Sequence, residues 1–197
     1  MLRRVTDQLL AVQADGVTTI GINGVDGSGK TVFASELVEQ LRAQSDREVL
    51  SFSIDDFHHP QLRRYKSGTL SARGFYEDSF NKQALIDKVL HPLKQGDRHY
   101  QSKHFDHRID KEVDFPRKRA AQDSIAIIEG VFLFTPDLVK YFDYKIFLHA
   151  DFKNTMQRGI DREVAVNPSR NVDELQEKYL QRYIPGQELY GSVRNFV

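Results

Sequence analysis

The chain has 197 residues, with 28 Lys and Arg balanced by 28 Asp and Glu, and it contains no Cys. This length suits one domain of roughly 100 to 200 residues, which buries enough apolar surface to fold without covalent staples. The absence of Cys excludes a disulfide framework, a thiolate zinc site and a cysteine nucleophile. Zero net charge argues against a general polyanion binder, so we expect no nucleic-acid partner.

The N-terminal segment and the apolar runs predict a chain with neither a secretion signal nor a membrane span. Its first four residues are followed by Asp7 and Gln8 rather than by a continuous apolar core. The longest apolar runs, 125–128 and 131–134, are separated by Glu129 and are too short to cross a bilayer. We therefore expect a cytoplasmic protein with no membrane partner.

Apolar periodicity predicts helices that alternate with short strands. Leu2, Val5, Leu9 and Val12 recur at helical spacing and predict an opening helix that ends near Asp15-Gly16. Strands are expected at 17–23, 49–54, 124–128 and 144–149. Helices are expected after the glycine-rich turn that follows residue 23, at 79–94, and from residue 151 onward with an interruption at Asn167-Pro168. This alternation is typical of an α/β fold with a parallel sheet covered on both faces.

Two segments do not follow this alternation. Residues 61–74 look irregular, and four basic residues there are expected to be exposed: Arg63, Arg64, Lys66 and Arg73. Residues 98–115 alternate charged, aromatic and apolar side chains, which favours a small β-hairpin insert. We expect a single domain over residues 1–197 that includes this insert. Ligands of parallel sheets bind beyond the carboxyl ends of the strands, so the chemistry should follow Asn23, Ile54 and Ile128.

An eight-residue stretch after the first expected strand matches the P-loop pattern GxxxxGK(S/T) in full. Its residues are Gly24, Val25, Asp26, Gly27, Ser28, Gly29, Lys30 and Thr31. The glycines let backbone N–H groups surround phosphate oxygens, and the helix that follows offers the positive end of its dipole. Lys30 can reach the β- and γ-phosphates, and the Thr31 hydroxyl can bind Mg²⁺. The loop therefore predicts a site for a nucleoside triphosphate.

A P-loop occurs in kinases, GTPases and mechanical ATPases, so it does not by itself define the reaction. A GTPase carries an Asn-Lys-x-Asp guanine reader, and the nearest string here, Asn81-Lys82-Gln83-Ala84, lacks the acid. This difference disfavours a GTPase. A nucleotide-dependent switch or binding protein without a metabolite acceptor stays open as an alternative.

Acidic residues follow two of the expected strands. Asp55 and Asp56 come after the second strand, where a carboxylate facing the P-loop can accept a hydroxyl proton during phosphoryl transfer. The alternative is that either residue caps a turn. Glu129-Gly130 follows the third core strand, where a carboxylate can hold Mg²⁺ directly or through water. The alternative there is a turn-initiating Glu-Gly pair.

Five segments in order resemble the uridine kinase branch of P-loop kinases, which includes phosphoribulokinase and bacterial pantothenate kinase. They are GVDGSGKT, IDDFHHP, HFDHR, IIEGVFLF and YKIFL, and the resemblance spans residues 21–190. It implies a three-layer P-loop NTPase fold with a helical lid at about 151–170. It also implies ATP and Mg²⁺ as cofactors and transfer of the γ-phosphate to a small hydroxyl-bearing substrate, foremost a nucleoside such as uridine or cytidine. A homo-oligomer is left open.

The resemblance assigns roles to individual residues. Asp55 matches the catalytic base, with Lys30 and Arg162 assisting, and Asp55 also joins Thr31 and Glu129 in the set of metal-linked oxygens. Three lid arginines match those that lean on the phosphates: Arg158 and Arg162 on ATP, and Arg170 toward the substrate. The other residues implied on the substrate side are His58, His107 and Arg108.

Three departures from the family pattern bear on the lid, the acceptor and the chain end. Gln157 and Gly159 make the lid poorer in arginine than is usual. Phe75-Tyr76-Glu77-Asp78 replaces the family's Phe-Asp-His-Pro segment, so Asp78 is only a nearby candidate for the acid that binds ribose. This second change keeps open another small alcohol as acceptor, such as pantothenate or a sugar phosphate. Relatives also continue into a further strand beyond the position of Val197.

Other constellations are assigned no chemistry. A zinc site from His99, His104, His107 and Asp106 is disfavoured, because these residues alternate along the expected hairpin. Residues 117–119 (Arg-Lys-Arg) are expected to form a solvated turn. Three tyrosines near the C-terminus are expected to pack a helix and a loop around Pro185-Gly186: Tyr179, Tyr183 and Tyr190.

Overall fold

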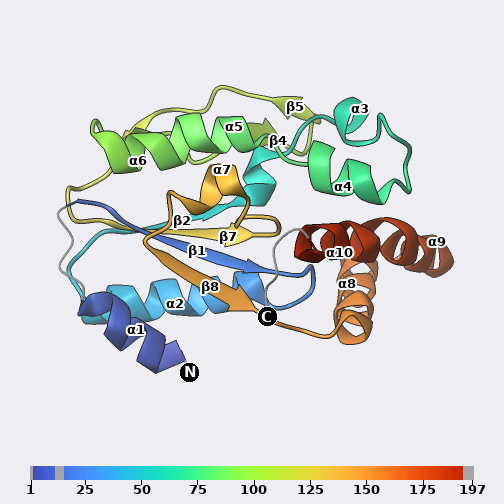
Figure 1. Ribbon diagram of the computed structural model, residues 1–197, viewed down its shortest axis with the longest axis horizontal. Helices are drawn as coiled ribbons and strands as arrows, with labels where there is room; N and C mark the ends of the chain where they lie inside the picture. The colour runs from blue at the N-terminus through green and yellow to red at the C-terminus, as the bar shows by residue number, and fades with distance from the viewer. Residues whose placement is uncertain (1, 12–15, 193–197) are drawn as a thin grey trace.

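A four-stranded parallel sheet forms the centre of the computed structural model, which describes residues 2–11 and 16–192 (Figure 1). The strand order is β2-β7-β1-β8. The strands are β1 (Thr18–Gly24), β2 (Val49–Ser53), β7 (Ile125–Gly130) and β8 (Tyr144–Leu148). The expected parallel α/β sheet is confirmed, and all four predicted core strands are present.

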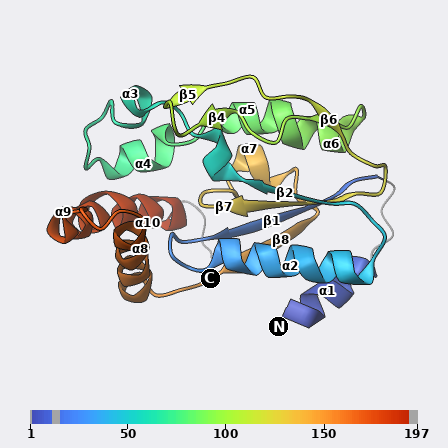
Figure 2. The same ribbon diagram turned by 180° about the vertical axis from the view of Figure 1, so that it is seen from behind.

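Helices cover both faces of this sheet (Figures 1 and 2). One face carries α1 (Leu2–Leu10) and α2 (Lys30–Gln44). The other carries α7 (Pro136–Val139) and a continuous helical run made of α5 (Lys82–Leu85), the π-helical turn η2 (Ile86–Leu90) and α6 (His91–Gln95). A third group stands at the carboxyl ends of the strands: α8 (Phe152–Val166), α9 (Val172–Lys178), the π-helical turn η3 (Tyr179–Tyr183) and α10 (Ile184–Ser192).

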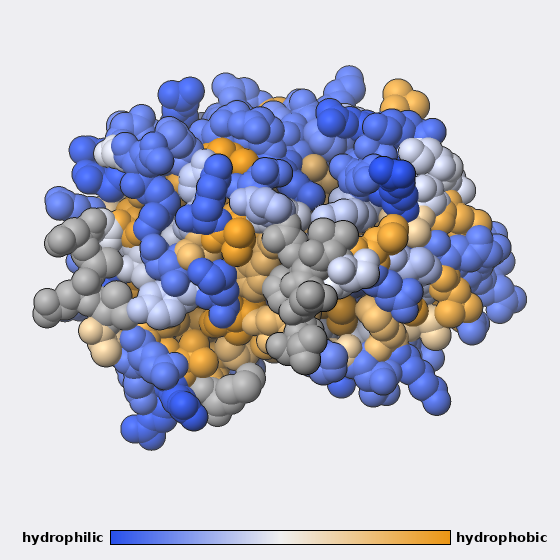
Figure 3. Space-filling model, in the orientation of Figure 1, coloured by the Kyte–Doolittle hydropathy of each residue, from blue (hydrophilic) through white to orange (hydrophobic). Residues whose placement is uncertain are grey.

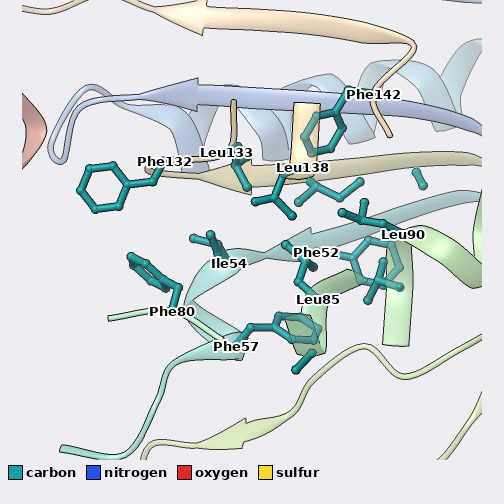
Figure 4. Close-up of a cluster of buried hydrophobic side chains, with 14 of the residues drawn as sticks. Phe52, Ile54, Phe57, Phe80, Leu85, Leu90, Phe132, Leu133, Leu138 and Phe142 are labelled. Carbon is teal, nitrogen blue, oxygen red and sulfur yellow. The ribbon is translucent and has the colours of Figure 1, made fainter. Parts of the chain in front are cut away.

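The hydrophobic core forms two layers, one on each face of the sheet. Ile125 and Ile127 of β7 pack toward α2, whereas Ala126 and Ile128 belong to the opposite layer. That opposite layer includes Phe52, Phe57, Leu85, Leu90 and Phe132, among others drawn in Figure 4. Because successive strand side chains alternate between faces, a strand buried on both faces is apolar at nearly every position.

The first half of the chain departs from the sequence predictions in three places. The opening helix ends at Leu10 within the described residues, and Val12 and the expected helix end at Asp15 lie outside them. The segment expected to be irregular holds two helices, α3 (Gln61–Arg64) and α4 (Ala72–Asp78), and Arg64 is half-buried rather than exposed. The helix expected over 79–94 begins at Lys82, because the Asn81 side chain accepts the Ala84 N–H at 3.0 Å and caps it.

The predicted hairpin insert is present and extends further than expected. β4 (Phe105–Asp106) pairs antiparallel with β5 (Lys111–Glu112), and β3 (His99–Tyr100) pairs with β6 (Lys118–Arg119). The expected turn at 117–119 is therefore wrong for its last two residues, which form an exposed strand at the base of the insert.

The C-terminal region contains more helix than the sequence suggested. The loop expected at Pro185-Gly186 is wrong, because both residues lie at the start of α10, which continues directly from the π-helical turn η3. Within residues 2–11 and 16–192, no helix combines the length and the apolar character that a membrane crossing requires. Figure 3 shows mainly hydrophilic side chains along the upper edge of the molecule and hydrophobic ones nearer its middle.

The close approach of β1 to α7 and its flanking segments generates a stability prediction. A Cβ added at Gly21 would lie 2.8 Å from Phe134 Cε1 and 2.9 Å from Phe142 Cγ. We expect Gly21→Ala to lower the free energy of unfolding by about 1–3 kcal/mol, as overpacking typically does. Urea denaturation measures this change. Gly191→Ala in α10 is the control, because among the described residues no atom beyond the backbone of its own helix and its chain neighbours lies within 4 Å of the added Cβ there. Equal stability of the two variants would contradict the prediction.

Candidate active site

The phosphate-binding loop joins the carboxyl end of β1 to the start of α2. Gly27 has φ +75° and Gly29 has φ +89°, the left-handed region that favours glycine. A Cβ at Gly27 would also lie 2.5 Å from the Thr155 carbonyl oxygen of α8. The loop therefore needs glycine at 27 both for its own conformation and for its contact with α8.

A cavity of about 520 Å³ opens at the carboxyl ends of β1, β2 and β7. P-loop residues line part of this cavity. Glu129, near the end of β7, and Asp55, in the turn η1 (Ile54–Phe57) after β2, contribute two acids to its lining. Ten of the sequence-predicted site residues line it: Asp26, Gly27, Gly29, Lys30, Thr31, Asp55, His58, Glu129, Arg158 and Arg162. The arrangement agrees with the rule that ligands of parallel sheets bind beyond the strand ends.

Lys30 is a buried lysine that lines this cavity. Its Nζ donates a hydrogen bond to the Val25 carbonyl oxygen at 2.7 Å. Burial lowers the pKa of Lys30, and the negative charges of Asp26, Glu129 and Asp55 oppose that shift. The ammonium group is therefore held in place inside the loop, where it can neutralise an incoming phosphate.

Glu129 is the buried acid of the site. Burial raises the pKa of Glu129, and hydrogen bonds from the Ser53 and Thr31 hydroxyls act in the opposite direction. Hydroxyl and carboxylate oxygens are ligands that suit Mg²⁺, so Thr31, Glu129 and Asp55 fit this ion by their chemistry. Among the residues that the structure describes, no group of three or more acidic, His or Cys side chains is arranged to hold a metal ion by itself. Mg²⁺ would therefore need oxygens from water and phosphate as well, as is common in nucleotide sites.

Two imidazoles fix the backbone of Asp55. His58 Nδ1 and His107 Nε2 each lie 2.8 Å from the Asp55 carbonyl oxygen. A carbonyl oxygen only accepts, so both ring nitrogens are the protonated ones. The two rings also pack edge to face, with centroids 5.1 Å apart, and burial lowers the pKa of His58. The hairpin insert thereby contacts the turn that carries the candidate base.

Four predicted substrate-side residues do not line the cavity: His107, which contacts the Asp55 carbonyl oxygen instead, Arg108, Asp78 and Arg170. Arg108 is exposed and binds the Asp106 carboxylate, and this hydrogen bond lowers the pKa of Asp106 to about 2. Asp78 is buried and pairs with Lys66 Nζ at 2.7 Å. Arg170 Nη2 lies 3.8 Å from a Glu163 carboxylate oxygen and lines a separate cavity beside α9.

The other three P-loop residues, Gly24, Val25 and Ser28, do not line this cavity. Gly24 and Val25 line a neighbouring, largely apolar cavity of about 390 Å³. The Ser28 hydroxyl is buried inside the loop. The histidines considered for zinc also separate, since His99 faces Asp97, His104 faces Glu112 and His107 binds Asp55.

The structure adds residues that sequence reasoning missed. The aromatic side chains of Phe75, Phe80 and Tyr183 also line the cavity. The sequence predicts only a packing role for Tyr183, and no local pattern marks the two phenylalanines as site residues. These three residues come from separate parts of the chain, and hydrophobic periodicity does not reveal that the fold brings them to one cavity.

The C-terminal helices contact the P-loop through Asp26. Arg162 Nη2 lies 3.2 Å from one carboxylate oxygen, and the Tyr179 hydroxyl donates to the other at 2.6 Å. The Asp26 backbone N–H donates to Gln187 Oε1 at 2.5 Å. Of these partners, only Arg162 is a site residue that the sequence predicts.

Comparison with known proteins places these features in a family. Residues 19–185 match the model of the "Phosphoribulokinase / Uridine kinase family". The uridine kinase of Saccharomyces cerevisiae is 27% identical over 164 residues, which cover 78% of this chain and 30% of the yeast protein. The chain thus spans less than a third of that relative's length.

Two solved structures share the fold over almost the whole chain. A possible uridine kinase from Bacillus stearothermophilus superposes with a TM-score of 0.76 at 22% identity, covering 98% of this chain and 91% of that one. A candidate fructose transport system kinase from Silicibacter sp. TM1040 gives a TM-score of 0.77 at 21% identity, covering 98% and 94%. Together with the P-loop, these likenesses confirm the expected P-loop NTPase α/β fold.

Proposed function

The chain belongs to the phosphoribulokinase/uridine kinase family, and on that premise we propose that it transfers the γ-phosphate of ATP to a hydroxyl group of a small molecule. One observation carries the proposal: the P-loop residues Lys30 and Thr31 line the same cavity as Asp55 and Glu129. A nucleotide switch needs the loop, but it has no use for an acid across the cavity that can take up a hydroxyl proton.

The reaction joins the acceptor oxygen to the γ-phosphorus and breaks the bond from that phosphorus to the bridging oxygen of ADP. Asp55 takes the hydroxyl proton as the acceptor attacks. Lys30 from the P-loop, and Arg158 and Arg162 from α8, line the cavity with positive charge that can stabilise the transferring group. Thr31, Glu129 and Asp55 would hold Mg²⁺, which when bound neutralises phosphate oxygens.

A nucleoside such as uridine or cytidine is the acceptor that we favour. The family relationship supports it, and so do the rings of Phe75, Phe80 and Tyr183, because a flat base can pack against aromatic side chains. The imidazole of His58 adds a polar group to the same wall.

A different small alcohol is the second candidate, and the position of Asp78 favours it. The Asp78 carboxylate pairs with Lys66 and does not line the cavity, so it is not placed to bind a ribose diol. Screening ADP release with ATP and Mg²⁺ across nucleosides, vitamins and sugar phosphates separates the candidates. Nucleotide turnover that no added hydroxyl compound changes would favour the switch or binding protein instead.

Replacing the proposed base tests the catalytic assignment. We expect Asp55→Asn to reduce turnover by about 10²–10⁴-fold, because an amide cannot accept the hydroxyl proton. ATP binding, measured by titration calorimetry, should stay near that of the wild-type protein. Asp56→Asn is the matched control, since that carboxylate pairs with Lys103 at 3.0 Å and does not line the cavity. Normal turnover in Asp55→Asn with loss in Asp56→Asn would reverse the assignment.

The insert generates a paired kinetic prediction. His107→Ala removes a donor to the Asp55 carbonyl, so we expect kcat/KM for the acceptor to fall roughly ten- to a hundredfold, as small misplacements of a catalytic group do. The KM for ATP should barely move. Arg108→Ala changes a side chain that faces solvent, and its acceptor kinetics should match the wild type. Steady-state kinetics of both variants check this, and an unaffected His107→Ala would remove the insert from the site.

The metal assignment predicts a changed requirement for Mg²⁺. Chelation of Mg²⁺ should abolish turnover, and Glu129→Gln should raise the Mg²⁺ concentration for half-maximal activity by roughly 10–100-fold, the effect of losing a ligand or its orienting group. Glu163→Gln is the control, because Glu163 lines the same cavity but pairs with Arg170. An Mg²⁺ titration that is identical in both variants would argue against a metal role for Glu129.

A further inference from the structure

Asp26 places a negative charge inside a loop whose task is to bind an anion. Its carboxylate lines the cavity beside Lys30, and its charge is one of those that act on the Lys30 ammonium group. A carboxylate at this position repels phosphate oxygens unless a neighbouring donor or cation offsets its charge when the phosphate binds.

The partners of Asp26 all come from the helices after β8. Arg162 of α8 binds one carboxylate oxygen at 3.2 Å, and Tyr179 of η3 binds the other at 2.6 Å. Gln187 of α10 accepts the backbone N–H. One loop residue therefore contacts three separate parts of the C-terminal helical group.

The packing of α8 is shaped around the contact with Tyr179. A Cβ added at Gly159 would lie 1.8 Å from the Tyr179 hydroxyl oxygen, so the phenol passes over the bare backbone of α8 to reach Asp26. Tyr179 itself is only 2% exposed. The Tyr179 contact is thus part of the buried structure of the helical group.

The Arg162 contact differs, because it can be given up at low cost. The Arg162 side chain is 58% exposed and makes a single ion pair with Asp26, through one nitrogen and one oxygen. If Arg162 turns to another anion in the same cavity, Asp26 still keeps the Tyr179 hydroxyl and is not left without a donor.

We propose that Asp26 is an internal competitor of the nucleotide: its carboxylate holds Arg162 at the P-loop before a nucleotide binds and yields it to the phosphates of a bound triphosphate. Tyr179 retains the carboxylate during the exchange. The inference rests on the proposed function, since it takes Arg162 as a phosphate ligand. It makes Asp26 and Tyr179 positioning residues that set how strongly the site prefers a triphosphate to a shorter nucleotide.

Titration calorimetry on the full chain tests the exchange, with β,γ-imido-ATP and ADP as the ligands and Mg²⁺ present. We expect Asp26→Asn to bind β,γ-imido-ATP roughly fivefold more tightly than the wild-type protein, the scale of a part-exposed ion pair. Affinity for ADP should change less than about twofold, because ADP lacks the γ-phosphate that recruits Arg162. In an Arg162→Met background the same Asp26→Asn change should tighten β,γ-imido-ATP binding by less than about twofold.

Controls separate competition from simple repulsion. Glu163→Gln removes the same charge from the same cavity without removing a hydrogen-bond or ion-pair partner of Arg162, and its affinity for β,γ-imido-ATP should stay within about twofold of wild type. If Asp26→Asn does not fold, as judged by circular dichroism, Asp26→Ser takes its place with the same expectation.

Two results would overturn the inference alone, and a third would also overturn the proposed function. Weaker binding of β,γ-imido-ATP by Asp26→Asn would mean that Asp26 supports the nucleotide site. Undiminished tightening in the Arg162→Met background would mean that Asp26 acts by repulsion only. A wild-type protein that binds no β,γ-imido-ATP would contradict the kinase proposal as well, whereas normal wild-type binding keeps the two failures distinct.

Discussion

The burial of the Lys30 ammonium group inside the P-loop is the interaction around which the site is organised. An ammonium group out of water is costly unless hydrogen bonds and opposite charges surround it. Here the P-loop wraps around the group and supplies the Val25 carbonyl, while β7 and η1 bring Glu129 and Asp55 near enough to oppose the effect of burial. The ends of three parallel strands must coincide for this to happen, so the register of the sheet and the charge balance of the cavity depend on each other.

A second set of contacts ties the insert to the acid-bearing turn. His107 and His58 share the Asp55 carbonyl, the His104 N–H donates to the Asp56 carbonyl at 2.9 Å, and Lys103 pairs with the Asp56 side chain. Three of these contacts hold main-chain carbonyls and the fourth holds the Asp56 side chain, so none of them engages the Asp55 carboxylate. The carboxylate stays exposed to the cavity while its backbone is held, which suits a group that has to exchange a proton with a bound molecule.

Features that depend on local sequence were predictable. The P-loop, the buried strands and the acids at their ends follow from residue spacing and from the rule that parallel strands end at one edge. The ion-pair or hydrogen-bond partner that each polar side chain takes in the folded protein was not predictable. Asp78 has the chemistry of a ribose ligand, but Lys66 neutralises it outside the cavity, and Asp106 holds Arg108 in solvent. The Tyr179–Asp26 bond joins residues 153 positions apart, and nothing near either residue indicates it.

Gly159 and Tyr179 depend on each other, although Gly159 itself takes no part in the proposed chemistry. Any residue with a side chain there would occupy the space through which the Tyr179 phenol passes. A larger residue at 159 would therefore require either a change of Tyr179 or a shift of α8 away from the P-loop. The space that the Tyr179 phenol takes therefore leaves no room for an arginine at position 159 while α8 keeps its place beside the P-loop.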